Sequence, residues 1–201
     1  MGYLAAQPLV AASWDPPYSF AANPISDLGN TLCGQFERPD GTASYVCSPR
    51  HAWMNTAFVL VGLLTMAGAI LVRGQWPRRR LATVGVALVA AAGVGGVLVG
   101  LAPADANLAV HTSGALLQVP GAAGMLLLGL ATVKRRGWVP IFGLMCGTVA
   151  TVACVLFLAG TYLGLGMGGM ERLAFDTLTV WTGVLGGVFL RDALNRRPGG
   201  P

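Results

Sequence analysis

Long apolar stretches alternate with short polar connections over most of the chain. Five of these stretches have the roughly 20 residues that a spanning helix needs. They are residues 51–72, 81–102, 111–133, 138–162 and 171–190. None shows the period-2 alternation of apolar and polar residues that is typical of outer-membrane barrels. The pattern therefore predicts an all-α membrane protein.

The first apolar stretch, residues 2–14, is shorter than the others. Its residues 2–13 cover roughly 18 Å at 1.5 Å per residue, whereas the hydrocarbon core of a bilayer is about 30 Å thick. We interpret it as a short first span: either a re-entrant piece or the end of a span that begins before the sequence given. The sequence thus predicts one domain, residues 1–201, forming a bundle of six transmembrane helices with a large loop at residues 15–50.

The basic residues predict the orientation of the bundle. The connections 73–80 and 134–137 and the tail after Leu190 hold ten of the thirteen Lys and Arg residues. By the positive-inside rule this side is cytoplasmic, so both termini are expected in the cytoplasm and the loop 15–50 outside. Both histidines and every carboxylate except Asp192 then lie on the outer side. We expect a multi-pass protein of the cell membrane.

Composition agrees with a membrane location. The chain is 54% hydrophobic and 10% charged, with a mean hydropathy of +0.64, whereas soluble domains have about 25% charged residues. A net charge of +5 is also found in proteins that bind polyanions. Here the basic residues stand at the ends of apolar spans, where membrane orientation explains them, so no nucleic-acid partner is predicted. The expected partners are the bilayer and an apolar small molecule or lipid; an oligomer stays open.

Two of the four cysteines, Cys33 and Cys47, fall in the outer loop. An oxidising compartment permits a disulfide there. Such a bridge closes a loop of about 15 residues, worth roughly 3 kcal/mol in the chain-entropy model. The alternative, two metal thiolates, lacks close ligand spacing. We predict a Cys33–Cys47 disulfide.

Polar residues near the outer ends of the spans are candidates for chemistry. His51 and Asn55 are four residues apart and share a helix face, while Trp53 points elsewhere, toward the interface belt. As an alternative, His51 is a capping or solvated boundary residue. Asp105 precedes the helix that carries His111, and capping alone explains an Asp at that place.

Gln118 lies seven residues after His111, on the same face. Polar side chains at membrane depth usually face the bundle interior and mark function. Glu171 stands at a helix start, where the helix dipole favours a carboxylate. Arg172 and Asp176 are four residues apart and can pair. A glycine-rich loop, residues 163–170, precedes them.

The sequence around several of these residues resembles motifs of a bacterial and archaeal membrane family known as domain of unknown function 998. The matching pieces are Asn23-Pro24-Ile25-Ser26-Asp27-Leu28-Gly29, Cys47-Ser48-Pro49 with His51 and Asn55, Pro103-x-Asp105 with His111, and Glu171-Arg172. The similarity covers nearly the whole chain. It implies six spans and no established common activity. The sequence departs from the family in its shortened first span.

The first functional hypothesis is an enzyme with an outward-facing acid–base site. Desolvation raises the pKa of a carboxylic acid at an apolar boundary, so that it can act as a general acid with histidine as its partner. This chemistry suits protonation-initiated cyclisation or isomerisation of an isoprenoid, as in terpene cyclases, or hydrolysis of a lipid. The predicted catalytic residues are Asp27, His51, Asp105, His111 and Glu171. The predicted substrate-binding residues are Asn55, Trp53, Gln118, Phe175, Asp176 and Trp181, whose aromatic members can stabilise a cation.

The alternative is a non-catalytic accessory subunit that binds a lipid, a peptide or a partner protein. The same polar residues then form a hydrogen-bonding network that fixes the loop to the helices. A transporter is less favoured, because the polar groups cluster at one boundary rather than at the bilayer midplane. No cofactor is predicted. A zinc variant would use His51 and His111 with carboxylates, since catalytic zinc takes three protein ligands.

Overall fold

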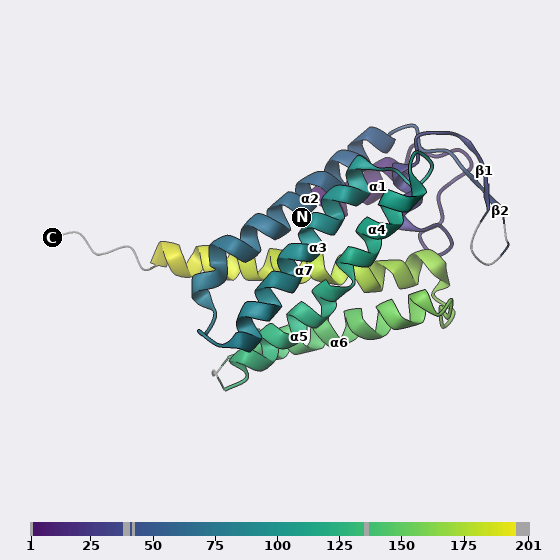
Figure 1. The fold of residues 1–201 in the computed structure, drawn as a ribbon. Coiled ribbons are helices and arrows are strands. Elements are labelled where there is room, and N and C mark those ends of the chain that lie inside the picture. The colour runs from purple at the N-terminus through teal and green to yellow at the C-terminus, as the bar shows by residue number, and fades with distance from the viewer. Residues whose placement is uncertain (1, 38–40, 42, 135–136, 196–201) are drawn as a thin grey trace.

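The computed structural model describes residues 2–37, 41, 43–134 and 137–195. They form a helical bundle with a short β-hairpin at one end (Figure 1). The α-helices are α1 (Gly2–Ala11), α2 (His51–Leu71), α3 (Arg80–Leu101), α4 (Leu108–Gln118), α5 (Pro120–Thr132), α6 (Val139–Leu158) and α7 (Gly166–Asn195). Two 3-10 helices, η1 (Ile25–Gly29) and η2 (Val72–Gln75), lie in connections.

Five helical stretches are long and apolar enough to cross a membrane. They cover residues 51–75, 80–101, 108–132, 139–158 and 166–195. Helix α1 has only 10 residues. The prediction of an all-α membrane protein with a short first helix is therefore confirmed.

The connections gather at two ends of the bundle, as the predicted crossings require. The long segment between α1 and α2 lies at one end with the α3–α4 and α6–α7 connections (Figure 1). We call this the outer end. The α2–α3 and α5–α6 connections lie at the other, basic end. Four residues of the predicted basic side, Arg135, Arg136, Arg196 and Arg197, fall outside the described residues.

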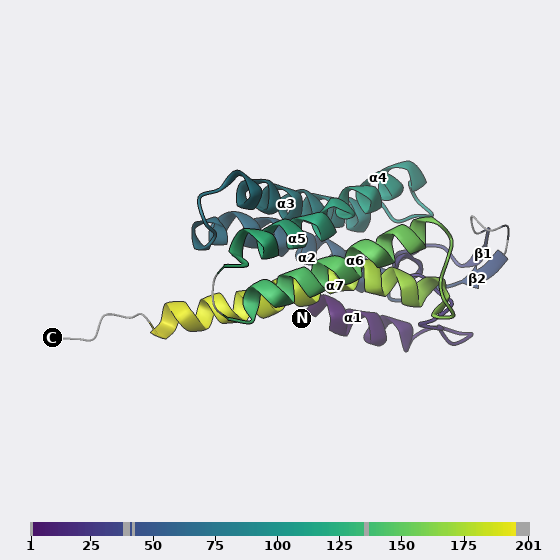
Figure 2. The ribbon, with the colours of Figure 1, turned by 90° about the horizontal axis from the view of Figure 1, so that it is seen from below.

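Helix α3 lies at the centre of one layer, where it packs against α2, α4 and α5, while α6 packs against α5 and α7 (Figure 2). Small residues allow this close packing in lipid. A Cβ atom added at Gly62 of α2 would lie 2.6 Å from the Gly93 carbonyl oxygen of α3. The two backbones are therefore in direct contact.

The predicted span 111–133 is broken near its middle. Helix α4 ends at Gln118 and α5 begins at Pro120. Proline has no backbone N–H, and the Val119 N–H donates to the Leu116 carbonyl at 3.2 Å in a tighter turn. The two helices nevertheless form one stretch long enough to cross the membrane.

Helix α7 begins earlier and ends later than the predicted span 171–190. It covers Gly166–Asn195, so the prediction of a glycine-rich loop over residues 163–170 is wrong after position 165. The reason is tertiary: the Gly168 and Gly169 N–H groups donate to the Ala21 carbonyl at 2.8 and 3.3 Å. A side chain at Gly168 would collide with the Asn23 carbonyl. Glycine therefore lets the helix start beneath residues 12–50, the connection between α1 and α2, which we call the outer segment.

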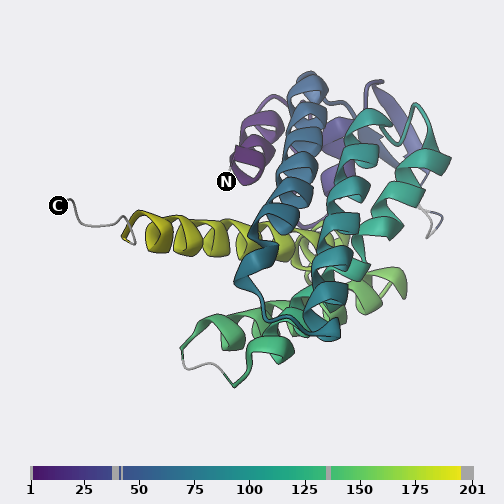
Figure 3. The ribbon, with the colours of Figure 1, turned by 60° about the vertical axis from the view of Figure 1, so that its left-hand side comes forward.

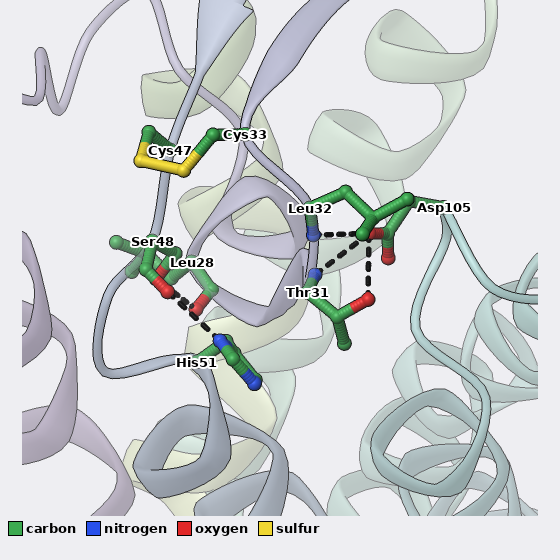
Figure 4. Close-up of a disulfide and its surroundings, with 8 residues drawn as sticks. All are labelled: Leu28, Thr31, Leu32, Cys33, Cys47, Ser48, His51 and Asp105. Atoms are coloured by element: carbon green, nitrogen blue, oxygen red, sulfur yellow. Dashed lines mark hydrogen bonds between the residues drawn. A yellow bond between two sulfur atoms is a disulfide. The ribbon is translucent and has the colours of Figure 1, made fainter.

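The outer segment contains the antiparallel hairpin of β1 (Gly34–Glu37) and β2 (Ala43–Val46), with Gly34 opposite Val46. The Cys33–Cys47 disulfide joins the residues that flank these strands (Figure 4). The predicted disulfide is confirmed. The hairpin itself was not predicted.

Candidate functional site

Arg172, in the first turns of α7, is the centre of a polar cluster beneath the outer segment. Its guanidinium donates to the Gln7 side-chain carbonyl at 3.0 Å, the Tyr18 hydroxyl at 2.6 Å and the Phe20 carbonyl at 2.9 Å. It also lies 5.5 Å from the Tyr18 ring centroid and 4.8 Å from that of Phe20. A cation near the membrane interior is costly unless its donors are satisfied. Here residues from α1 and the outer segment satisfy them.

Tyr18 extends this cluster into the outer segment. Its hydroxyl donates to the Asn23 and Pro24 carbonyls at 2.7 and 2.8 Å. Burial raises the pKa of the Tyr18 phenol well above its ordinary range, and the Arg172 charge opposes that shift. Tyr18 therefore stays protonated and keeps donating at neutral pH.

Gln7 connects Arg172 to Asp176. Its side-chain NH₂ donates to both carboxylate oxygens of Asp176, at 3.1 and 3.0 Å. Tyr3 of α1 interacts with the same carboxylate. The predicted pairing of Arg172 with Asp176 is thus replaced by a bridge through Gln7, which is only 4% exposed.

Two further carboxylates hold the part of the outer segment that precedes the hairpin. Glu171 Oε2 accepts a hydrogen bond from the Ile25 N–H at the start of η1. Asp27, in η1, is 6% exposed and accepts from the Asn23 side chain at 3.2 Å. Both acids therefore accept hydrogen bonds from residues of the segment 23–32, which we call the anchored loop.

Asp105, in the α3–α4 connection, fastens the other end of the anchored loop (Figure 4). Its Oδ2 accepts from the Thr31 N–H at 2.7 Å, the Thr31 hydroxyl at 2.9 Å and the Leu32 N–H at 2.7 Å. The Cys33–Cys47 disulfide follows at once in the sequence. Asp105 Oδ1 is buried and has no partner among the described atoms.

The start of α2 supports the middle of the anchored loop. Asn55 donates to the Gly29 carbonyl at 2.9 Å, and Ser48 donates to the Leu28 carbonyl at 2.7 Å. The His51 Nδ1–H donates to the Ser48 carbonyl at 2.9 Å. A side chain at Gly29 would collide with Asn55 Oδ1, so the Asn55 side chain, which binds the Gly29 carbonyl, would have to move.

His111 is buried in the first turn of α4, with 8% of its surface exposed. Its Nδ1–H donates to the Ala102 carbonyl, at the end of α3, at 2.9 Å. Asp105 interacts with it electrostatically. Gln118 lies two turns deeper and packs against Gly95 of α3. The histidine thus closes the α3–α4 turn.

The structure brings most of the predicted site residues to the outer end in two groups. The first group contains Glu171 and Asp176 with Arg172, and Glu171 interacts electrostatically with Asp27. In the second group, Asn55 and Asp105 contact the anchored loop and His51 contacts its flank. His111 belongs to the second group through its electrostatic interaction with Asp105. The catalytic role of these residues stays a prediction.

Three predicted aromatic residues have ring contacts outside these groups. Trp53 is 59% exposed, with the Arg50 guanidinium 5.4 Å from its ring centroid. Phe175 packs edge-to-face on Phe157. Trp181 is buried ten residues after Glu171, roughly 15 Å along the helix, and stacks on Trp76 of the basic end at 6.2 Å.

Sequence reasoning missed four residues that complete the outer network: Gln7, Tyr18, Asn23 and Thr31. Gln7 carried a signal, since it is a lone amide within an apolar stretch, as Gln118 is. The other three lie in an irregular segment, where no periodicity identifies inward-facing positions. No three His, Cys, Asp or Glu side chains of the described residues gather closely enough to hold a metal ion.

An apolar groove lies between α2 and α7, closer to the basic end. Its volume is about 240 Å³. On α2 it begins at Val61, one turn after Phe58, which contacts Tyr3 of α1; on α7 it begins at Thr179, one turn after Asp176. Helix α1 therefore lies beside the outer part of these two helices (Figure 3), and the groove starts where the contacts of α1 end.

Comparison with known proteins assigns the chain to a family. The family described as "Protein of unknown function (DUF998)" matches residues 2–188. No curated protein and no solved structure matches the chain. Because the match covers almost the whole sequence, the chain belongs to this family.

Proposed function

We propose that this member of the DUF998 family is a lipid-binding membrane protein, which holds a hydrocarbon chain in the groove between α2 and α7. The groove is the observation that carries the proposal. Its lining is mostly aliphatic and aromatic, with three threonines, Thr65, Thr179 and Thr182, as the polar members.

The position of the groove supports a ligand that enters from the bilayer. Leu64, on its rim, is 71% exposed, while Leu128 and Leu185 at its base are buried. In a membrane the exposed faces of α2 and α7 contact lipid tails. A chain can therefore move sideways into the groove without desolvating a charged group.

The contacts of the outer carboxylates support binding rather than catalysis. Glu171 and Asp105 accept hydrogen bonds from backbone N–H groups of the anchored loop, and Asp176 accepts from Gln7. These hydrogen bonds are suited to carboxylates that fasten the outer segment to the bundle, as the non-catalytic hypothesis expects.

A groove-filling substitution tests the proposal. A Cβ atom added at Gly186, which lines the groove, meets no other atom within 4 Å, so Gly186→Leu places a side chain in the cavity. Gly187→Leu is the matched control, because Gly187 is equally unobstructed, lies on the same helix and does not line the groove.

Native mass spectrometry of the detergent-purified protein, titrated with dioleoyl-phosphatidylcholine, gives the readout. Wild type and Gly187→Leu should retain a bound lipid, and Gly186→Leu should bind it about ten-fold more weakly. Equal lipid binding by all three proteins would contradict the proposal.

The second candidate is the acid–base enzyme acting on a lipid or isoprenoid. One observation favours it: Asp105 Oδ1 is buried without a described partner, and the Asp105 carboxylate interacts electrostatically with His111. A carboxylate oxygen in that state can exchange a proton with a substrate. Lipid profiles of cells that express wild type or Asp105→Asn test this candidate. A product that appears only with wild type would establish it, and identical profiles would remove it.

A further inference from the structure

The connection between α2 and α3 forms a basic hollow at the end of the groove. Its volume is about 780 Å³, and four arginines line it: Arg73, Arg78, Arg79 and Arg80. All four are exposed, and none has a side-chain hydrogen bond or ion pair within the part of the chain that the structure describes. Membrane orientation accounts for arginines on this side. It does not account for their arrangement around a hollow.

Trp76 forms a wall shared by the basic hollow and the apolar groove. It is only 8% exposed, although it lies in a connection between two helices. Its ring stacks on Trp181 at 6.2 Å and meets the edge of Phe189 at 6.0 Å. Val86 also lines both spaces. The apolar groove and the four arginines are therefore adjacent parts of one surface.

We propose that the ligand of this surface is an anionic phospholipid. Its acyl chain lies in the groove, and its phosphate is bound by the arginines of the hollow. This inference rests on the proposed function and adds the chemical class of the lipid. The charges are complementary, because guanidinium groups bind phosphate oxygens through paired, charge-assisted hydrogen bonds. Basic pockets beside spanning helices suit anionic headgroups.

The position of the arginines favours a lipid phosphate over a free one. Arg80 is the first residue of α3, and Arg73 follows the end of α2, so both lie where a span leaves the hydrocarbon region. A phospholipid places its phosphate at this depth while its chains extend toward the groove. A free phosphate ion would gain nothing from the adjoining apolar lining.

The test compares two lipids with the same dioleoyl chains: phosphatidylglycerol, which is anionic, and phosphatidylcholine, which is zwitterionic. Each is titrated into purified protein and counted by native mass spectrometry. Wild type should bind phosphatidylglycerol about ten-fold more tightly. Arg79→Gln/Arg80→Gln should lose most of that preference and keep its affinity for phosphatidylcholine. Lys134→Gln/Arg191→Gln, which removes the same charge outside the hollow, should behave as wild type.

The outcomes separate this inference from the proposed function. If wild type binds both lipids equally while Gly186→Leu weakens both, the anionic preference is overturned and the groove proposal stands. If Gly186→Leu weakens neither, the groove proposal itself fails. Equal loss of preference in both double variants would overturn the inference, because overall charge would then explain it. Displacement of phosphatidylglycerol by millimolar inorganic phosphate alone would also overturn it.

Discussion

Gln7 of α1 and Asp176 of α7 are 169 residues apart in the sequence, and the Gln7 amide donates to both oxygens of the Asp176 carboxylate. Its carbonyl accepts from Arg172. The neutral Gln7 side chain thus lies between the Arg172 guanidinium and the Asp176 carboxylate at the outer end of the bundle and forms hydrogen bonds with both. This arrangement joins the first helix of the bundle to the last.

Gln7→Ala should lower the free energy of unfolding by about 1–3 kcal/mol, because it leaves the buried Arg172 Nε–H without its acceptor and removes the two hydrogen bonds from Gln7 to Asp176. Denaturant unfolding in detergent measures the effect. Gln35→Ala is the control, since Gln35 is exposed in β1 and surface substitutions usually change stability by less than about 0.5 kcal/mol. Equal stability of the two variants would show that the bridge contributes nothing.

Asp105→Ala should release the anchored loop, because Asp105 accepts three hydrogen bonds from Thr31 and Leu32. The Thr31 and Leu32 amides should then exchange with solvent about ten-fold faster, which corresponds to roughly 1.4 kcal/mol of lost protection. Hydrogen-exchange mass spectrometry of the peptide that contains both residues measures this. Asp15→Ala, at an exposed position of the outer segment, should leave the rate unchanged. Unchanged exchange in Asp105→Ala would contradict the anchoring role.

The sequence predicted the spans well, because apolar length and the positions of charges are local properties. It predicted α7 poorly, since the start of that helix depends on the Ala21 carbonyl, which comes from a segment far away in the chain. The same limit applies to the site. Glu171, Asp105 and His111 stood out as polar residues beside apolar spans. However, Glu171 and Asp105 bind backbone groups of the anchored loop, and His111 binds the carbonyl at the end of α3. No residue pattern encodes which backbone N–H group faces a given carboxylate.

The predicted orientation places the basic end in the cytoplasm. Gln75→Cys introduces a thiol at that end, and Thr161→Cys introduces one at the outer end. The background is low, because Cys33 and Cys47 are paired and Cys146 and Cys154 are buried. In intact cells a membrane-impermeant thiol reagent should label position 161 and leave position 75 unlabelled until the membrane is opened. Labelling of position 75 in intact cells would show that the orientation is the reverse of the predicted one.

Substitution of His111 by Asn distinguishes a structural role from a chemical one. Asn can replace the imidazole as a hydrogen-bond donor but not as a group that exchanges protons. The amide of Asn can donate to the Ala102 carbonyl as the His111 Nδ1–H does. It cannot exchange a proton near neutral pH. If His111 closes the α3–α4 turn, His111→Ala should lower the free energy of unfolding by about 1–3 kcal/mol, and His111→Asn should recover most of that loss.

Lipid binding in the groove provides the second readout for these two variants. The groove lies toward the basic end, and its lining does not include His111, so both variants should bind dioleoyl-phosphatidylcholine as wild type does once folded. The acid–base hypothesis makes a different prediction about stability and product. It expects both variants to stay folded and both to lose any lipid product that wild type forms. Loss of such a product in His111→Asn, at unchanged stability, would make the imidazole a proton-transfer group and identify the outer end as the reactive one.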